Sequence, residues 1–394
     1  MILPLATLLS ALALAALTAC GGGGGDTGVA AGPVTPPVTD PAATPPDATP
    51  VATAPVVPPT GPDVVAPVTA PYGADLVTTV AATTYPDGSA SKGAWDALQT
   101  ARSTCGFGKV SQDTRLDVAN NAHAYYNAKT SADLINNNQY YFSHYQVAPT
   151  ATTPSPYFSG VNWDDRAQAA GWPSTSRVTE IISMRLVPRA TTNSTGALIE
   201  NEASGSSLMN VLLSLPYHLS GGMTAGRYAG VGSNLQTATK ASTGSLTDYL
   251  QVGALISAED SNRQKIGSKV VATYPCAGVT AALAVFRPAT ELPNPFPSIT
   301  STSTSYGTPV YAKVDSGQIL VVNSTTIKKV LDGVAVPIAT LTQATDPNRH
   351  FKSNEFLAVP TVALAKSTDY AVEIVGTVDG AAFTKNFTFT TSAL

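Results

Sequence analysis

The sequence predicts an α+β domain followed by an all-β sandwich, with an N-terminal signal peptide and a disordered linker in front of them. Three observations predict this order. An apolar run ends at Cys20, and a Gly-, Pro- and Thr-rich stretch without periodicity follows it. Helix-like runs then precede strand-like runs, and short β-rich runs fill the end of the chain. We therefore expect segments at 1–19, 20–74, 75–297 and 298–394.

The first segment has the properties of an export signal. Residues 2–19 are apolar or small, and so short a core is typical of a cleaved peptide rather than a spanning helix. Leu17-Thr18-Ala19-Cys20 is similar to the lipobox of bacterial lipoproteins, whose cysteine is diacylated and whose peptide is cut just before it. We expect lipidation at Cys20 and anchoring to the membrane by two acyl chains. An ordinary signal peptide with an incidental cysteine is the alternative, since no Lys or Arg precedes the run.

The stretch 20–74 is predicted to be a tether. Gly21–Gly25 lacks the preceding strand and the following Gly-Lys-Ser/Thr of a phosphate-binding loop. The Pro- and Thr-rich residues after it cannot bury enough apolar surface to fold. Gly21, rather than an aspartate, follows Cys20 and favours the outer membrane. The expected location is therefore the bacterial envelope, on its periplasmic or cell-surface side, with the folded part held away from the bilayer.

Charge argues against nucleic acid as a partner. Only 12% of the residues are charged, the formal net charge is −4, and the longest basic run is Lys328-Lys329. Such a chain has no basic field to concentrate phosphate backbones. A ligand must instead be recognised by shape and a few polar groups.

Residues 75–297 contain helical periodicity first and strand-like runs later. The expected helices are Gly93–Arg102, Thr114–Lys129, a short helix capped by Ser131, and Ser206–Leu215 ended by Pro216. The expected strands are Tyr228–Leu235, Thr247–Ile256, Val270–Tyr274 and Ala281–Phe286. This order predicts helices packed on an antiparallel sheet.

A series of short motifs in this region resembles the CAP superfamily (cysteine-rich secretory, antigen 5 and pathogenesis-related proteins), in its bacterial SCP-like branch. The motifs are LDVANNAHAYY from Leu116, Phe-Ser-His at 142–144, Asp-Arg at 165–166 leading into AQAAGW, Thr-Glu-Ile-Ile from Thr179, LLSLPYH ending at His218, and Tyr-Ala-Gly-Val-Gly from Tyr228. The resemblance implies an α-β-α sandwich with a cleft in which two histidines and two glutamates can converge.

The resemblance assigns three cleft residues. His144 matches the first family histidine, Glu180 matches a family glutamate, and His218 matches the second histidine. The second glutamate, expected near Ser214 or Leu215, has no match. The resemblance thus implies a site of three members.

Two interpretations of this site remain open. Two imidazoles and a carboxylate with an open fourth position could hold a divalent metal such as Zn²⁺ and activate water. The same groups could instead form a hydrogen-bonded cleft in which Glu180 orients one imidazole and no metal is bound. His123 shares a helix face with Leu116 and Ala119, so it is either a buried, hydrogen-bonded histidine or a further cleft residue.

The remaining cysteines are expected to pair. With Cys20 acylated, Cys105 and Cys276 remain in an oxidising compartment. A bridge between them would tie the start of the domain to its end. Two buried free thiols are the alternative.

Residues 298–394 predict an antiparallel sandwich of immunoglobulin-like type. The expected strands are Val310–Val314, Gln318–Asn323, Thr326–Asp332, Val334–Leu341, Phe356–Val359, Asp369–Val378 and Ala382–Thr391. The stretch from Leu364 to Tyr370 resembles the corner motif of bacterial Ig-like domains. His350 is expected to be a solvated loop residue.

Together these features predict a membrane-anchored, extracytoplasmic CAP-domain lipoprotein that binds a lipid or cell-envelope component. A metal-dependent hydrolase of envelope material, using His144, Glu180 and His218, is one alternative. A structural or adhesive surface protein is another. The first interpretation favours a binding module over an enzyme and leaves catalysis open.

Overall fold

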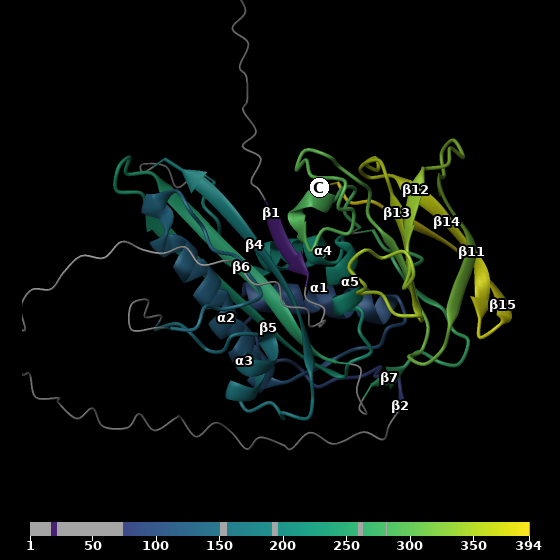
Figure 1. Cartoon of the computed structure of the whole chain (residues 1–394), viewed down its shortest axis with the longest axis horizontal. Coiled ribbons are helices and arrows are strands. Elements are labelled where there is room, and N and C mark those ends of the chain that lie inside the picture. The colour runs from purple at the N-terminus through teal and green to yellow at the C-terminus, as the bar shows by residue number, and fades with distance from the viewer. Residues whose placement is uncertain are drawn as a thin grey trace, which may run out of the picture. The chain divides into compact units, whose positions relative to one another are not determined.

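The computed structural model is a mixed α+β structure (Figure 1). It describes residues 17–21, 74–149, 156–190, 196–258, 263–280 and 282–393. The expected signal peptide up to residue 16 and the expected linker from residue 22 to 73 lie outside the described residues. Within the described ranges, no helix is both long and apolar enough to cross a membrane.

Six strands of the described chain form a mixed sheet. Their order is β3 (Ser111–Gln112), β5 (Tyr228–Thr239), β6 (Leu246–Ser257), β4 (Val178–Arg189), β1 (Leu17–Gly21) and β9 (Glu291–Leu292). The long strands β5, β6 and β4 pair antiparallel along their whole length. Strand β1 pairs antiparallel with β4 on one side and parallel with β9 on the other. A strand from the start of the chain therefore covers the outer edge of β4 (Figure 1).

Helices cover both faces of this sheet. They are α1 (Ala90–Thr104), α2 (Thr114–Asp133), α3 (Trp163–Ala169), α4 (Glu202–Leu212) and α5 (Pro216–Gly222), with the 3₁₀ turns η1 (Ile135–Asn137) and η2 (Pro288–Thr290). Successive side chains of a strand point to opposite faces. Ile181 accordingly packs in the core formed with α1 and α4, whereas Met184 packs against Ala128 of α2.

Side-chain caps fix where the helices begin. Ser89 accepts a hydrogen bond from a first-turn backbone N–H of α1, and Asp113 does the same for α2. Asn162 and Asn201 form capping boxes at the starts of α3 and α4. These caps satisfy backbone donors that the helices themselves leave unpaired.

Helices α1 and α4 approach each other through glycine. A Cβ atom at Gly205 would lie 1.9 Å from the carbonyl oxygen of Ala90, and one at Gly93 would lie 2.0 Å from that of Glu202. No other residue type permits this backbone approach. The crossing therefore depends on these two positions.

The rest of the chain forms two further antiparallel sheets arranged as a sandwich. One contains β12 (Ile338–Leu341), β13 (Glu355–Pro360), β10 (Val310–Lys313) and β8 (Ala272–Tyr274), and the other contains β11 (Leu320–Lys329), β14 (Asp369–Val378) and β15 (Ala381–Thr390). Residues from both sheets, such as Val310 and Ile374, share one apolar cluster. The short strands β2 (Ala74–Asp75) and β7 (Gln264–Lys265) pair with each other.

The two folded regions share a sheet and a core. Strand β8 comes from the segment predicted to close the first region, yet it pairs with β10 of the second. Tyr311 and Phe351 lie in the same apolar cluster as Trp95 of α1. The expected disulfide between Cys105 and Cys276 is confirmed, with Cα atoms 5.4 Å apart.

Several local expectations were wrong. Ser131 lies inside α2, where its hydroxyl bonds to Tyr141, because α2 continues to Asp133. Pro216 starts α5 rather than only ending the previous helix, since proline is well suited to the first turn.

Two strand expectations in the later part of the chain also differ. The expected strands Gln318–Asn323 and Thr326–Asp332 are one strand, β11, with an irregularity between Val322 and Ser324. An irregularity of this kind lets one strand keep its partner through a change of register. Of Ala281–Phe286, the described residues form only isolated bridges, from Ala282 and Phe286.

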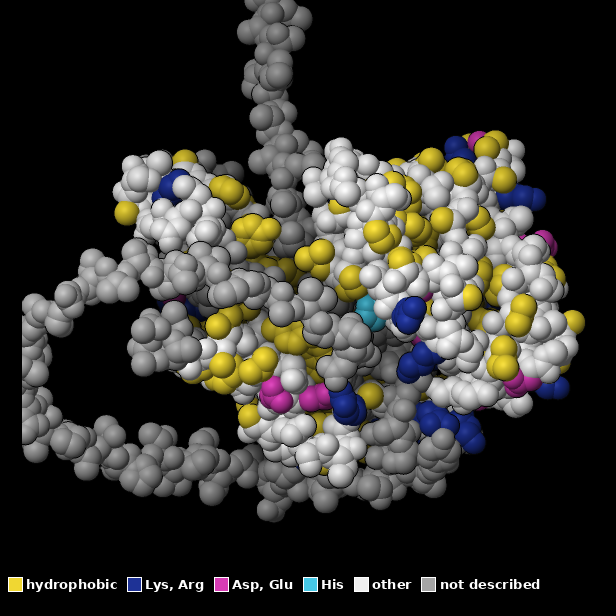
Figure 2. Space-filling model, in the orientation of Figure 1, with side chains coloured by type: hydrophobic (Ala, Val, Ile, Leu, Met, Phe, Trp, Pro, Cys, Tyr) yellow, Lys and Arg dark blue, Asp and Glu magenta, His cyan; other side chains and the backbone are white. Residues whose placement is uncertain are grey.

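On the face shown in Figure 2, Lys, Arg, Asp and Glu side chains lie scattered among neutral ones. This distribution follows from the low fraction of charged residues in the sequence, 12%. Most of the charge that matters for the site below is buried.

Candidate functional site

The structure brings the four expected cleft residues together at the start of β4. Glu180 lies on β4, His123 on α2, His218 on α5, and His144 on the segment between η1 and α3. All four side chains are at most 1% exposed. His144 Nδ1 lies 2.7 Å from a Glu180 oxygen, and the rings of His144 and His218 stack with centroids 6.1 Å apart.

Glu180 is the centre of a buried charge network. Its Oε1 accepts a hydrogen bond from Arg166 Nη2 at 2.6 Å, and its Oε2 accepts one from His144. Burial alone would raise the pKa of Glu180, but Arg166, His123 and His144 outweigh it and hold the pKa well below its ordinary range. Glu180 is therefore an ionised carboxylate whose two oxygens are both engaged.

His123 is a neutral residue of this network. Gln146 Nε2 lies 3.1 Å from His123 Nδ1, so that ring nitrogen accepts, and Nε2 then donates to the carbonyl oxygen of Ser143 at 3.0 Å. Burial lowers the pKa of His123 to about 3, against the attraction of Glu180 3.7 Å away. It holds the segment that carries His144 in place.

His144 is fixed on two sides. Its Nδ1–H donates to Glu180, and its ring meets Trp163 edge to face with centroids 5.9 Å apart. Burial lowers the pKa of His144, although the hydrogen bond to Glu180 opposes this shift. A carboxylate that accepts from one ring nitrogen fixes the tautomer and the orientation of the ring.

His218 has a carboxylate partner that the sequence did not predict. Glu291 on β9 is fully buried, and its Oε1 lies 3.2 Å from His218 Nδ1 and 2.7 Å from the backbone nitrogen of Tyr217. Burial raises the pKa of Glu291, against the effect of His218. The carboxylate accepts a backbone N–H, so His218 donates from Nδ1.

No glutamate was expected to match near Ser214 or Leu215, and Ser214 donates to the Val211 carbonyl just after α4. Glu291 reaches the site only because β9 joins the central sheet. The available signal was one acidic residue in an otherwise uncharged, proline-rich stretch from residue 288 to 300.

The two histidine–glutamate pairs differ in the groups that balance the charge of the glutamate. The charge of Glu180 is balanced by Arg166, whereas the second carboxylate has His218 as its ionisable partner and a raised pKa. Within the described residues, His218 Nε2 and Glu291 Oε2 are buried atoms without a hydrogen-bond partner. Buried polar atoms are normally paired, so these two unpaired atoms are the candidates for contact with a polar group.

Strand β1 runs beside these atoms. In its register Ala19 pairs with Glu291, Cys20 with Ile182, and Gly21 with Ile181, the residue after Glu180. Its bounds include the expected cleavage point before Cys20. The backbone of residues 17–21 therefore pairs with the two strands that carry Glu180 and Glu291.

The residues present do not form the expected three-ligand zinc site. Among the described residues, no group of three or more His, Cys, Asp or Glu side chains is arranged to hold a metal ion. A metal bound to Glu180 would have to displace Arg166 or His144.

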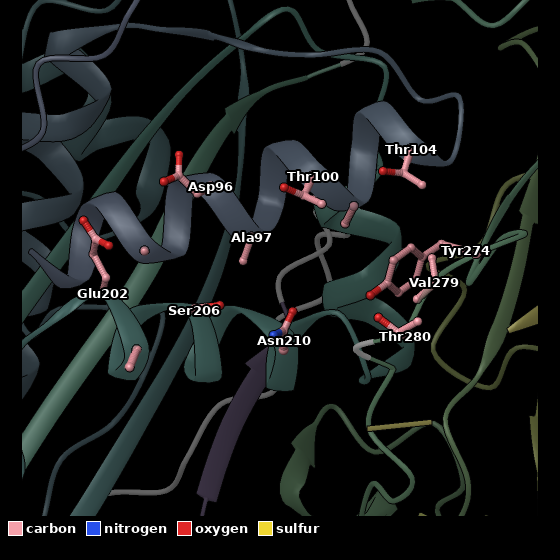
Figure 3. A pocket seen from close by; sticks show the side chains of 14 residues that line it. Asp96, Ala97, Thr100, Thr104, Glu202, Ser206, Asn210, Tyr274, Val279 and Thr280 are labelled. Atoms are coloured by element: carbon pink, nitrogen blue, oxygen red, sulfur yellow. The ribbon is translucent and has the colours of Figure 1, made fainter. Parts of the chain in front are cut away.

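A separate groove lies between α1 and α4, with a volume of about 560 Å³ (Figure 3). Asp96 and Glu202 line one end, and Tyr274 and Thr280 line the other (Figure 3). Asp96 is paired with Lys92, and Glu202 accepts from the backbone of Gly88. None of the cleft histidines lines this groove.

His350 is packed rather than solvated. Its ring lies 4.5 Å from that of Tyr217, centroid to centroid, and burial lowers its pKa. Tyr217 in turn donates to Asp346 from the loop that carries His350. His350 therefore packs against Tyr217 of α5, the helix that carries His218.

Comparison with known proteins adds no relative. No protein-family model matches the chain, and no curated protein sequence matches it.

Proposed function

We propose that the chain is a lipid-anchored, extracytoplasmic CAP-type protein that binds an envelope component in the cleft between His144 and His218. The observation that carries this proposal is the meeting of two histidine–glutamate pairs, with ring centroids 6.1 Å apart, from four separate segments. Helices on both faces of the sheet agree with the α-β-α layering that the resemblance implies. The family assignment itself rests on the sequence motifs.

Binding is favoured over catalysis by the state of the charged groups. Glu180 is engaged by Arg166 and His144, so it is not available as a general base. His218 Nδ1 lies 3.2 Å from Glu291 Oε1, and its Nε2 has no partner among the described residues, so a neutral ring that donates from Nδ1 would offer Nε2 as an acceptor. The cleft thus suits a ligand that donates a hydroxyl or amide hydrogen.

The C-terminal sheets support an Ig-like assignment for residues 298–394. The Tyr370 hydroxyl accepts a hydrogen bond from the backbone nitrogen of Ala365 at 2.8 Å. A tyrosine hydroxyl that bonds to the backbone a few residues upstream is typical of corners in such sandwiches. We propose that this region supports the cleft, since it shares a core with it.

The anchor is tested in cells. Metabolic labelling with an alkyne fatty acid should mark the wild-type protein but not Cys20→Ser, and the variant should leave the membrane fraction. Equal labelling of both would reject the anchor.

Binding is tested on the chain from residue 20 with Cys20→Ser. The change in melting temperature would be measured with three probes: a short-chain phospholipid, N-acetylglucosamine oligomers, and a peptide with the sequence of residues 16–22 that also carries Cys20→Ser. A ligand that stabilises the protein but not His218→Gln supports the proposal, and Lys328→Gln is the control because Lys328 is an exposed residue of β11. Stabilisation that survives in His218→Gln would reject this cleft as the site.

The hydrolase alternative requires a stoichiometric metal. Zinc would be measured in the purified protein and in His144→Ala and His218→Ala. Zinc that is lost in both variants would favour the hydrolase over the binding module.

A further inference from the structure

We infer that the slot between β4 and β9 is a binding site for an extended, uncharged peptide of small residues, which adds to the sheet as a strand. The inference deepens the proposed function and rests on it, because it names the ligand class of the same cleft. It depends on the backbone pairing of β1 and on the expected cleavage before Cys20.

The slot has a strand edge on each side. Leu17 to Gly21 pair with Arg185 to Ile181 of β4 in antiparallel register. Ala19 and Cys20 also pair in parallel with Glu291 and Leu292 of β9. A strand placed here completes the sheet from β3 to β9.

An empty slot would be costly. Residues Ile181 to Met184 of β4 are at most 1% exposed, so water reaches this edge poorly while the slot is filled. Backbone N–H and C=O groups that lose their ladder partners need replacements, and an open strand edge is a template for another chain. The edge of β4 therefore favours a new strand once the old one leaves.

Processing would remove the present occupant. Cleavage before Cys20 takes away Leu17, Thr18 and Ala19, which are three of the five residues in the β4 ladder. Cys20 would then carry acyl chains that remain in the bilayer. The mature protein thus presents a slot that its precursor fills with its own chain.

The site indicates what kind of peptide fits. The segment seated there, Leu-Thr-Ala-Cys-Gly, is uncharged and mostly small. In the register of β1, its Ala19 position pairs with Glu291, the partner of His218. Strand addition draws affinity from main-chain hydrogen bonds and selectivity from alternate side-chain positions. An extended peptide also supplies the amide donors that the cleft can accept.

The experiment uses the chain from residue 20 with Cys20→Ser. The probe is a synthetic heptapeptide with the sequence of residues 16–22, also carrying Cys20→Ser. Two control peptides carry N-methyl groups on alternate amides, one set for each edge of the added strand. Calorimetry measures affinity, and hydrogen-exchange mass spectrometry follows the amides of residues 181–185.

The peptide should bind and slow exchange at residues 181–185 by about tenfold or more. Methylation on the β4-facing edge should weaken binding by about tenfold, and more than methylation on the β9-facing edge, since β9 offers a shorter ladder. Equal binding of all three peptides, or no change in exchange, would overturn the inference. Full protection before any peptide is added would also overturn it, because the chain would then fill its own slot.

His218→Gln separates this inference from the proposed function. If the peptide protects β4 equally in wild type and His218→Gln, strand addition stands and the histidine cleft fails. If the other envelope probes bind in a His218-dependent way and the peptide does not bind, the proposed function stands and strand addition fails.

Discussion

Arg166 Nη2 lies 2.6 Å from Glu180 Oε1, and both side chains are wholly buried. Removing one partner of such a pair leaves the other as an uncompensated charge. The position of His144 depends on the same carboxylate. The ion pair therefore contributes both to the stability of the fold and to the position of His144.

We predict that Arg166→Met lowers the free energy of unfolding by about 3–5 kcal/mol. Arg177→Met is the matched control, because the Arg177 side chain is 73% exposed in its ion pair with Asp164. Its loss should change stability by less than about 1 kcal/mol. Urea unfolding checks both values, and similar losses in the two variants would contradict the buried-charge argument.

The two glutamates should respond differently to neutralisation. Glu180→Gln leaves Arg166 buried without its charge partner and should cost about 3–5 kcal/mol. Glu291→Gln should cost under about 2 kcal/mol, because burial already raises the pKa of Glu291 and penalises its charge. Unfolding curves at pH 7 compare them directly. A larger loss of stability in Glu291→Gln than in Glu180→Gln would contradict this prediction, because the charge of Glu291 would then be the more strongly stabilised of the two.

Acidification should destabilise the protein through its buried histidines. Burial lowers the pKa of His123 to about 3, so the unfolded chain takes up a proton below about pH 6.5 while the folded chain does not. The free energy of unfolding should then fall by about 1.4 kcal/mol per pH unit between those values. The lowered pKa of His144 acts in the same direction, and the raised pKa of Glu291 acts against it.

The variant His123→Gln tests this linkage. Between pH 6 and 4, the slope of its unfolding free energy against pH should be smaller than in the wild type by about 1.4 kcal/mol per pH unit. This difference in slope does not depend on the absolute stability of the variant. Urea unfolding at a series of pH values gives the slope. An unchanged slope would show that His123 titrates alike in the folded and unfolded states.

Loss of the disulfide should be expensive. The bridge joins Cys105 and Cys276 across a sequence separation of 171 residues, and such bridges contribute about 2–5 kcal/mol. Cys105→Ser combined with Cys276→Ser should therefore unfold at lower urea. Reduced wild-type protein is the control and should match the double variant; a clear difference would mean that the substitutions act by some route other than the bridge.

Much of the site could be predicted from sequence because short motifs surround its residues. His144 follows Phe-Ser and Glu180 precedes two isoleucines, and both lie where the motifs place them on the chain. The local signal at Glu291 is only its isolated charge in a proline-rich segment, because its role depends on β9 joining the sheet. Long-range strand pairing is the step that periodicity cannot supply.

The fold, like the site, was predicted where the signal is local in the sequence and missed where it depends on tertiary contacts. Helix α2 was predicted from its 3.6-residue period, and β14 from its alternation of apolar and polar residues. Strand β4 was missed because Glu180 and Ser183 interrupt its apolar run, although both are buried. Polar residues that are satisfied only by tertiary partners look like surface residues in a sequence.

The hydrogen bonds that hold α5 make the position of His218 depend on the C-terminal sheets. Tyr217 bonds to Asp346 and Ser220 bonds to Glu355, so the helix that carries His218 is fastened to the sandwich on both sides of that histidine. The position of His218 is thereby linked to the integrity of the sandwich. A substitution in the loop after β12 or in β13 can shift this histidine from a distance, and a fragment that ends at residue 297 would carry it without its support.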